Sequence, residues 1–119
     1  MDKRKLEFQQ RIYKYALCIV RFVKDLPRAS EYKILGNQLL RSGTSVAANV
    51  IEAYAASSKR DYINFYHHAL KSANESKLWF ALIRDISIKD NIEMQKMINE
   101  TIEIGKILGA SILNMKNKR

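Results

Sequence analysis

The sequence predicts an all-α fold, an antiparallel up-down-up-down four-helix bundle, and three observations point to it. Apolar residues recur every three to four positions along four long segments, which is the spacing of amphipathic helices. The sequence contains no sustained alternation with period two and no Asn-Gly or Asp-Gly hairpin dipeptide. The connections between the segments are short, so consecutive helices should run antiparallel. We therefore expect a single domain, residues 1–119, with helices at about 2–26, 30–56, 59–87 and 91–115.

Breaker and capping residues bound the first two predicted helices. Pro27 should end the first, because the residue before a proline avoids the helical conformation. Ser30 is the candidate N-cap of the second. Gly36 and Gly43 lie inside the second helix, where each costs about 1 kcal/mol relative to alanine, which is tolerable if another helix backbone comes close there. The apolar lines are Phe8, Ile12, Tyr15, Ala16, Ile19, Val23 and Leu26, and Leu35, Leu39, Val46, Val50 and Ala53.

The third and fourth predicted helices begin at polar capping residues. Ser58, with Asp61 three residues later, has the pattern of a capping box and should start the third helix. Asp90 or Asn91 can cap the fourth, although the break before it is the weakest of the three. Each helix of about 25 residues would be about 38 Å long.

The first predicted helix has more apolar surface than a bundle interior requires. At 100° per residue, its polar residues fall on one narrow stripe, and the apolar arc covers roughly 200°, about twice the usual minimum. The remainder of that arc, around Tyr13, Leu17 and Val20, is predicted to face another subunit. The alternative is a helix enclosed by neighbours of its own chain.

The charge of the chain is strongly positive and unevenly distributed. The net charge is +9, with 12 Lys/Arg against 5 Asp/Glu in residues 1–60 and 9 against 7 in residues 61–119. Such a charge favours RNA, DNA or an anionic membrane surface. The alternative is an ordinary solvated basic surface. The candidate nucleic-acid contacts are the basic stripe of the first helix and the pair that opens the third: Arg4, Arg11, Lys14, Arg21, Lys59 and Arg60.

A polar network is predicted between the second and third helices. Ser42, Ser45, Asn49 and Glu52 are spaced 3, 4 and 3 apart, so they share one helix side close to the apolar line. A carboxylate near a core must be paired or hydrogen-bonded. We expect the guanidinium beside this row to pair with a carboxylate of either helix, and the amide to bridge the two. The predicted members are Arg41, Ser45, Asn49, Glu52 and Glu75.

No catalytic or metal site is predicted. His67 and His68 are adjacent, so they point in different directions, whereas a helical metal pair needs i,i+3 or i,i+4 spacing. Positions 55 and 78 lack the histidine that a di-iron Glu-x-x-His motif requires, so we expect no metal, no cofactor and no enzymatic activity.

The cellular location predicted from the sequence is the cytoplasm. The single Cys18 cannot form an intrachain disulfide, which fits a reducing compartment. No signal peptide and no apolar run of the roughly 20 residues that span a bilayer are found, so no membrane partner is expected.

The stretch from "QLLRSGTSVAANVIEAYAASSKRDY" to "INFYHHALKSANES" resembles the 23S rRNA intervening-sequence proteins, small bacterial four-helix proteins. Ala53 and Ala56 depart from the family pattern, which has glycine and often a basic residue there. The matching positions are Gln38, Arg41, Ser45, Val46, Asn49, Glu52, Tyr54, Ser58, Asp61, Tyr62, Phe65, Ala69, Ser72 and Glu75.

The resemblance implies an antiparallel bundle that assembles as a ring-like homopentamer. A related branch, the accessory variability proteins of diversity-generating retroelements, is similar in fold and binds nucleic acid and a reverse transcriptase. The predicted function is therefore a non-enzymatic, oligomeric, nucleic-acid-binding bundle, with a reverse transcriptase as a further candidate partner. A structural or protein-interaction scaffold without physiological nucleic-acid binding is the alternative.

Overall fold

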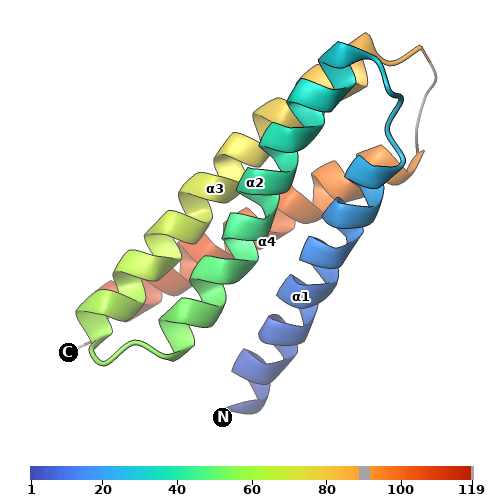
Figure 1. Ribbon diagram of the computed structural model, residues 1–119. Coiled ribbons are helices and arrows are strands. Elements are labelled where there is room, and N and C mark those ends of the chain that lie inside the picture. The colour runs from blue at the N-terminus through green and yellow to red at the C-terminus, as the bar shows by residue number, and fades with distance from the viewer. Residues whose placement is uncertain (89–91, 119) are drawn as a thin grey trace.

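The computed structural model describes residues 1–88 and 92–118. It contains four helices, α1 (Lys3–Lys24), α2 (Ser30–Tyr54), α3 (Lys59–Ile86) and α4 (Ile92–Asn117), and no strand among the described residues. The all-α four-helix prediction is confirmed. Figure 1 shows that each helix runs back along its predecessor, so the two termini lie at the same end of the molecule. The bundle is elongated, with extents of 51 × 21 × 20 Å.

The helix ends follow local capping chemistry, and one predicted cap is wrong. Ser58 caps α3 as predicted, since its side chain accepts from the Asp61 N–H at 3.1 Å. Ser30 is not the N-cap of α2, because the Lys33 N–H already bonds to the Ala29 carbonyl and the helix starts one residue earlier. The predicted caps Asp90 and Asn91 lie outside the described residues.

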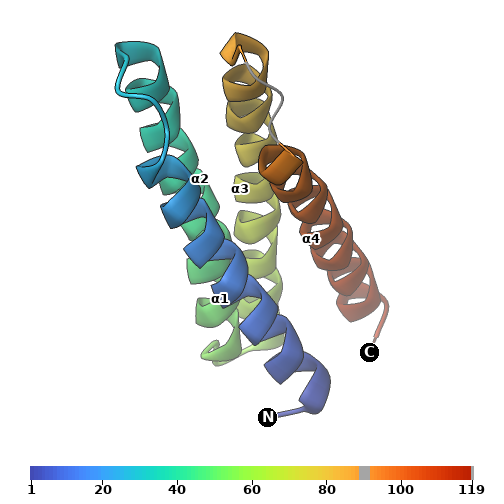
Figure 2. The same ribbon diagram turned by 90° about the vertical axis from the view of Figure 1, so that its right-hand side faces the viewer.

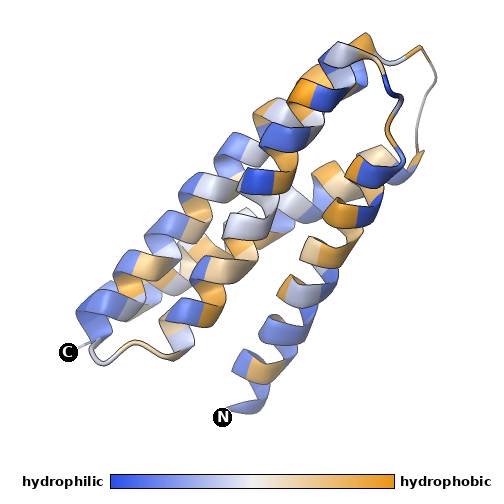
Figure 3. Ribbon diagram, viewed as in Figure 1, coloured by the Kyte–Doolittle hydropathy of each residue, from blue (hydrophilic) through white to orange (hydrophobic). Residues whose placement is uncertain are grey.

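The core is the apolar interior predicted from the helical periodicity. Figure 3 shows hydrophilic residues dominating the N-terminal turns of α1 and apolar residues becoming more frequent toward its C-terminal half. Leu35, expected in the apolar line of α2, is only half-buried. The fully buried apolar side chains are Ile12, Ile19, Leu39, Val46, Val50, Ala53, Ala69, Phe80, Ile83, Ile104 and Leu108.

The extent of contact differs between the helix pairs. Helices α2 and α3 form the closest pair, α1 packs on α2, α4 packs on α3, and α1 and α4 touch over only a short stretch. Figure 2 shows α1 and α4 as separate ribbons on the near side, with α2 and α3 behind them. Gly43 permits the α1–α2 contact, although the group that occupies its space is the Ile19 side chain and not the predicted helix backbone.

Candidate nucleic-acid interface

Two contacts fasten α1 to α4 midway along their length. The Tyr15 hydroxyl lies 2.6 Å from the Thr101 hydroxyl, and Thr101 donates its own proton to the Met97 carbonyl, so Tyr15 is the donor to Thr101. Arg11 forms a bidentate ion pair with Glu100, in which its Nε and Nη2 atoms donate to the two carboxylate oxygens at 2.8 and 2.6 Å. Burial raises the pKa of Tyr15 to about 12, and the hydrogen bond to Glu100 raises that of Arg11.

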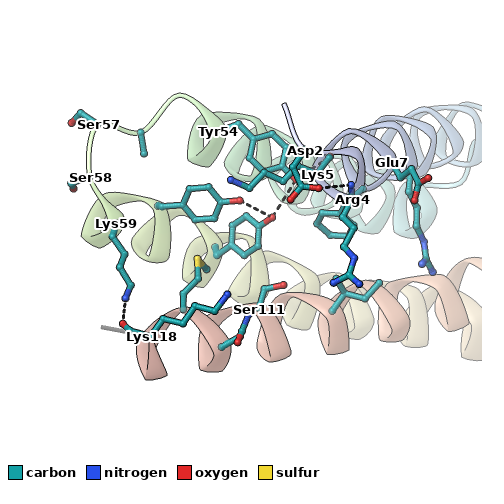
Figure 4. A pocket seen from close by; sticks show the side chains of 18 residues that line it. Asp2, Arg4, Lys5, Glu7, Tyr54, Ser57, Ser58, Lys59, Ser111 and Lys118 are labelled. Atoms are coloured by element: carbon teal, nitrogen blue, oxygen red, sulfur yellow. Dashed lines mark hydrogen bonds between the residues drawn. The ribbon is translucent and has the colours of Figure 1, made fainter.

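A pocket of about 1000 Å³ opens at the end of the bundle that carries the termini. It lies between the first turns of α1, the α2–α3 connection and the last turns of α4 (Figure 4). We call it the tyrosine pocket. Its lining includes three tyrosines, Tyr54, Tyr62 and Tyr66, and the apolar residues Phe8, Ile107 and Met115.

The three tyrosines form one packed cluster. The Tyr62 ring lies 4.9 Å from that of Tyr66 and 6.0 Å from that of Tyr54, measured between centroids. Their hydroxyls form a chain, in which Tyr62 donates to Tyr66, Tyr66 to Tyr54, and Tyr54 to the Lys5 carbonyl of α1. Burial is the main cause that raises the pKa of both Tyr66 and Tyr54, so these two hydroxyls are neutral at physiological pH.

Three of the six predicted nucleic-acid contacts converge on this pocket. Arg4 and Arg11 reach it from α1 and Lys59 from α3, although Arg11 is engaged by Glu100 and the Lys59 ammonium donates to the Lys118 carbonyl. Lys14, Arg21 and Arg60 are exposed and lie outside it. The structure therefore divides the predicted set into a pocket group and a separate exposed group.

Two pocket cations were missed by the sequence analysis. The Lys5 ammonium sits 5.0 Å from the centroid of the Tyr62 ring, in a cation–π contact. Lys118 reaches the pocket from the end of α4. Lys5 lies outside the helical stripe that selected Arg4 and Arg11, and nothing in the sequence alone places Lys118 beside the other end of the chain.

Two of the three predicted oligomer-interface residues are exposed on the surface of α1. Tyr13 is 68% exposed and Val20 is 44% exposed, while Leu17 is half-buried. Leu6, 47% exposed, extends the same side of the helix. We call these four residues the outward face of α1. A second apolar stripe, Leu78, Leu82 and Ile86, is exposed on one side of α3 at i, i+4 and i+8.

The predicted polar network exists only in part. Arg41 pairs with Glu75, which also accepts from the Trp79 indole at 2.9 Å. Glu52 is exposed and pairs with no described residue, so the other candidate partner of Arg41 is excluded. The reason is position: Glu52 lies about three turns further along α2 than Arg41.

The expected bridging role of Asn49 is also wrong. Its amide donates to the Ser45 carbonyl one turn earlier, and the Ser45 hydroxyl donates to the Arg41 carbonyl, so both bonds stay within α2. The buried polar link between the helices is instead Ser42 with Ser76, whose hydroxyls lie 2.7 Å apart. Both serines are fully buried, and each hydroxyl also has a carbonyl acceptor in its own helix, Leu39 for Ser42 and Ser72 for Ser76.

Replacing Glu75 with glutamine should lower the free energy of unfolding by less than about 1 kcal/mol, since the side chains of the pair are 57% and 35% exposed. The bond from Trp79, and then Arg41, holds the pKa of Glu75 below its ordinary value. The stabilisation is therefore present at neutral pH and is lost as the pH falls through the lowered pKa. Fluorescence of Trp79, the one tryptophan, reports the local change.

Glu103→Gln is the matched control, because Glu103 is an exposed carboxylate paired only at 3.7 Å with Lys106. It should leave both the stability and the Trp79 emission nearly unchanged. Identical acid titrations of unfolding for the two variants would contradict the contribution assigned to Glu75.

The residue types that make metal and catalytic sites are dispersed. Among residues 1–88 and 92–118, no group of three or more His, Cys, Asp and Glu side chains is placed to hold a metal ion. His67 is half-buried, His68 is exposed, and Cys18 is half-buried and free. Within the same part of the chain, no helix has both the length and the apolarity to cross a membrane.

Comparison with known proteins identifies the family. The 23S rRNA-intervening sequence protein family matches residues 4–110. The chain belongs to this family. A crystal structure of a protein of unknown function from the S23 ribosomal protein family of Bacteroides thetaiotaomicron is similar, with 34% identity and a TM-score of 0.80. The match covers 87% of this chain and 96% of that one. No curated protein matches the chain. Membership of the intervening-sequence family confirms the resemblance drawn from the α2–α3 segment.

Proposed function

We propose that the chain is a non-enzymatic homo-oligomer that binds RNA or DNA through the basic end of the bundle and the exposed cations of α1. The observation that carries the proposal is the convergence of cations from α1, from α3 and from Lys118, just after α4, on the tyrosine pocket. Five cationic side chains line it against the two carboxylates of Asp2 and Glu7. A local excess of positive charge over a concave surface favours a polyanion. The single free Cys18 fits the cytoplasmic location that we propose.

Self-association is part of the proposal, in the ring-like pentameric form that the family resemblance implies. The outward face of α1 and the Leu78–Leu82–Ile86 stripe of α3 are two different apolar surfaces on one subunit. Contact between unlike surfaces of successive copies is heterologous, and such contacts give a ring when the rotation from copy to copy closes and an open filament when it does not. A ring repeats the basic end once per subunit and so multiplies the number of phosphate contacts.

The second candidate function is a protein-interaction scaffold, with a reverse transcriptase as one partner suggested by the retroelement resemblance. The observation that favours it is the engagement of two predicted contacts inside the chain, Arg11 by Glu100 and Lys59 by the Lys118 carbonyl. Under this function the exposed apolar surfaces bind protein, and nucleic-acid affinity is weak and independent of Arg4, Lys14 and Arg21.

The test is light scattering after size exclusion, alone and with structured RNA, at low and high salt. The proposal expects a particle several times the 13.8 kDa chain mass that carries RNA. With about three phosphate contacts per subunit, affinity should fall roughly 40-fold between about 50 and about 200 mM salt for each subunit that engages the RNA. The triple variant Arg4→Glu, Lys14→Glu and Arg21→Glu should bind at least about 100-fold more weakly. Arg11 is left in place, because a glutamate there would face Glu100.

The matched control carries the same charge change elsewhere: Arg28→Glu, Lys33→Glu and Lys77→Glu, all at exposed positions outside the pocket and the stripe. Equal loss in the two triple variants would show that net charge alone governs binding. The pair Tyr13→Glu and Val20→Glu should yield the 13.8 kDa monomer, while Gln95→Glu on α4 should not. A monomeric parent protein would contradict self-association.

A further inference from the structure

We infer that the tyrosine pocket receives one unpaired nucleotide of a single-stranded nucleic acid, with its base against the aromatic and apolar wall and its phosphates at the cationic rim. The inference rests on the proposed nucleic-acid binding and specifies its form. It makes the end of the bundle a reader of exposed bases, whereas the exposed cations of α1 contact only backbone.

The size and lining of the pocket fit a nucleotide. A volume of about 1000 Å³ is at the upper end of the range for small-molecule sites, which leaves room for one nucleotide and its flanking phosphates. The base of a paired, stacked duplex cannot enter a recess of this kind unless it leaves the helix. An unpaired base enters without that cost, so the shape favours single strands.

The inner wall offers the surface that a base needs. Phe8 packs against Tyr66 at 6.5 Å between centroids, beside the Tyr54–Tyr62–Tyr66 cluster, so aromatic rings from three helices meet here. Stacking on aromatic rings is tolerant of sequence, because every base has a π-face. Figure 4 shows Ser111 of α4 across the pocket from Tyr54, where a hydroxyl can bond to a base edge.

The rim offers the complementary charge. Of the five lining cations, only Arg11 forms an ion pair with a described carboxylate, although Asp2 and Glu7 line the same pocket. The Lys59 ammonium donates to the Lys118 carbonyl. The Lys5 ammonium rests on the face of the Tyr62 ring, a position that an arriving base can take while the ammonium moves to a phosphate. The pocket therefore combines an apolar, aromatic interior with unpaired positive charge, which matches a nucleotide.

Assembly leaves the pocket accessible. Arg11, which lines it, and Tyr13, on the outward face of α1, are two residues apart and therefore about 200° apart around the helix. A second copy seated on the outward face consequently lies on the far side of α1 from Arg4 and Arg11, and Lys5 is the lining residue of α1 nearest to that copy.

The test is fluorescence anisotropy of the full-length protein with a short labelled oligouridylate and with an abasic strand of equal length. The two ligands have the same phosphates, so they differ only in the bases. We expect the abasic strand to bind about tenfold more weakly, the effect of losing one stacked base. Equal affinities would overturn the pocket inference while leaving the proposed function intact. Failure of both strands to bind would also overturn the pocket inference, and the proposed function would then be decided by the structured-RNA experiment alone.

A neutral pocket-filling variant locates the effect. Ser111→Trp projects into the pocket without changing charge and should weaken oligouridylate binding about tenfold, to the level of the abasic strand. Ala110→Trp, the adjacent exposed position outside the pocket, is the control and should bind as the parent does. In the unaltered protein, a 5-iodouridine strand should photocross-link to Tyr54 or Tyr62. Cross-links confined to residues outside the pocket would overturn the inference, whatever the folding of the tryptophan variants.

Discussion

Replacing Gly43 with alanine is expected to lower the free energy of unfolding by about 2 kcal/mol. A Cβ atom at this position would lie 2.2 Å from the Ile19 Cδ1 atom and 3.1 Å from its Cγ2 atom. Ile19 is fully buried on α1, and a β-branched side chain in a helix has one strongly preferred rotamer, so it has little room to yield. Overpacking of this kind costs about 1–3 kcal/mol, which outweighs the gain of about 1 kcal/mol in helix propensity. Denaturant unfolding followed by circular dichroism measures the difference.

Gly109 supplies the matched control. It also lies inside a helix, but no atom is within 4 Å of an added Cβ, and neither glycine has a positive φ angle. Gly109→Ala should therefore raise the free energy of unfolding by about 1 kcal/mol. Ile19→Val removes the Cδ1 atom and should make Gly43→Ala less costly than in the parent, a favourable coupling in a double-mutant cycle. Stabilisation by both alanine substitutions would contradict the close α1–α2 contact.

Helix existence was predictable because periodicity reports burial directly. The apolar spacing of α1, with Ile12, Tyr15 and Ile19 on one side, depends only on which face meets the core. The cap of α2 was not predictable, because Ala29 and Ser30 differ by one residue and the choice depends on where the chain turns after α1.

The tyrosine pocket required the tertiary arrangement. Tyr54 and Tyr62 lie on opposite sides of the α2–α3 connection, and their sequence spacing does not reveal that the rings meet. The pocket exists because α1 touches α4 over only a short stretch, around Tyr15 and Arg11. Helical periodicity within α1 and α4 gives no measure of how closely the two helices approach along their length.

The polar residues between α2 and α3 were also predictable only in part. Arg41 and Glu75 could be recognised as possible partners from their places on facing helices. Glu52 could have been excluded from the sequence, since it lies about three turns from Arg41 on the same helix. The pairing of Arg41 with Glu75 depended in addition on the register of α2 against α3. Asn49 illustrates a competing local effect, because a side-chain amide can bond to a carbonyl of its own helix and so never reach the neighbour.

Tyr15→Phe should be less stable than the parent at neutral pH and more stable in strong alkali. Loss of the hydroxyl that donates to Thr101 costs about 1 kcal/mol at neutral pH, and Thr101 keeps its bond to Met97. The Tyr15 ring is 3% exposed, and burial, the largest cause, raises its pKa from 10.0 to about 12. Guanidinium unfolding at a series of pH values, with circular dichroism as the signal, measures both effects.

The direction of the pH effect follows from proton binding. Below pH 10 the tyrosine is protonated in both states, so its stabilisation is fully present. Above that value the unfolded chain loses the proton first, and the folded protein loses stability until the pH passes its own raised pKa. The loss from Tyr15 is about 1 kcal/mol at about pH 11 and about 2 kcal/mol at about pH 12, so the stabilities of parent and Tyr15→Phe should cross near about pH 11.

The raised pKa values of Tyr54 and Tyr66 destabilise both proteins in the same direction and leave the crossing in place. Parallel curves for Tyr15→Phe and the parent would show that the Tyr15 hydroxyl ionises as readily in the bundle as in the unfolded chain, and the α1–α4 contact would then be open to water.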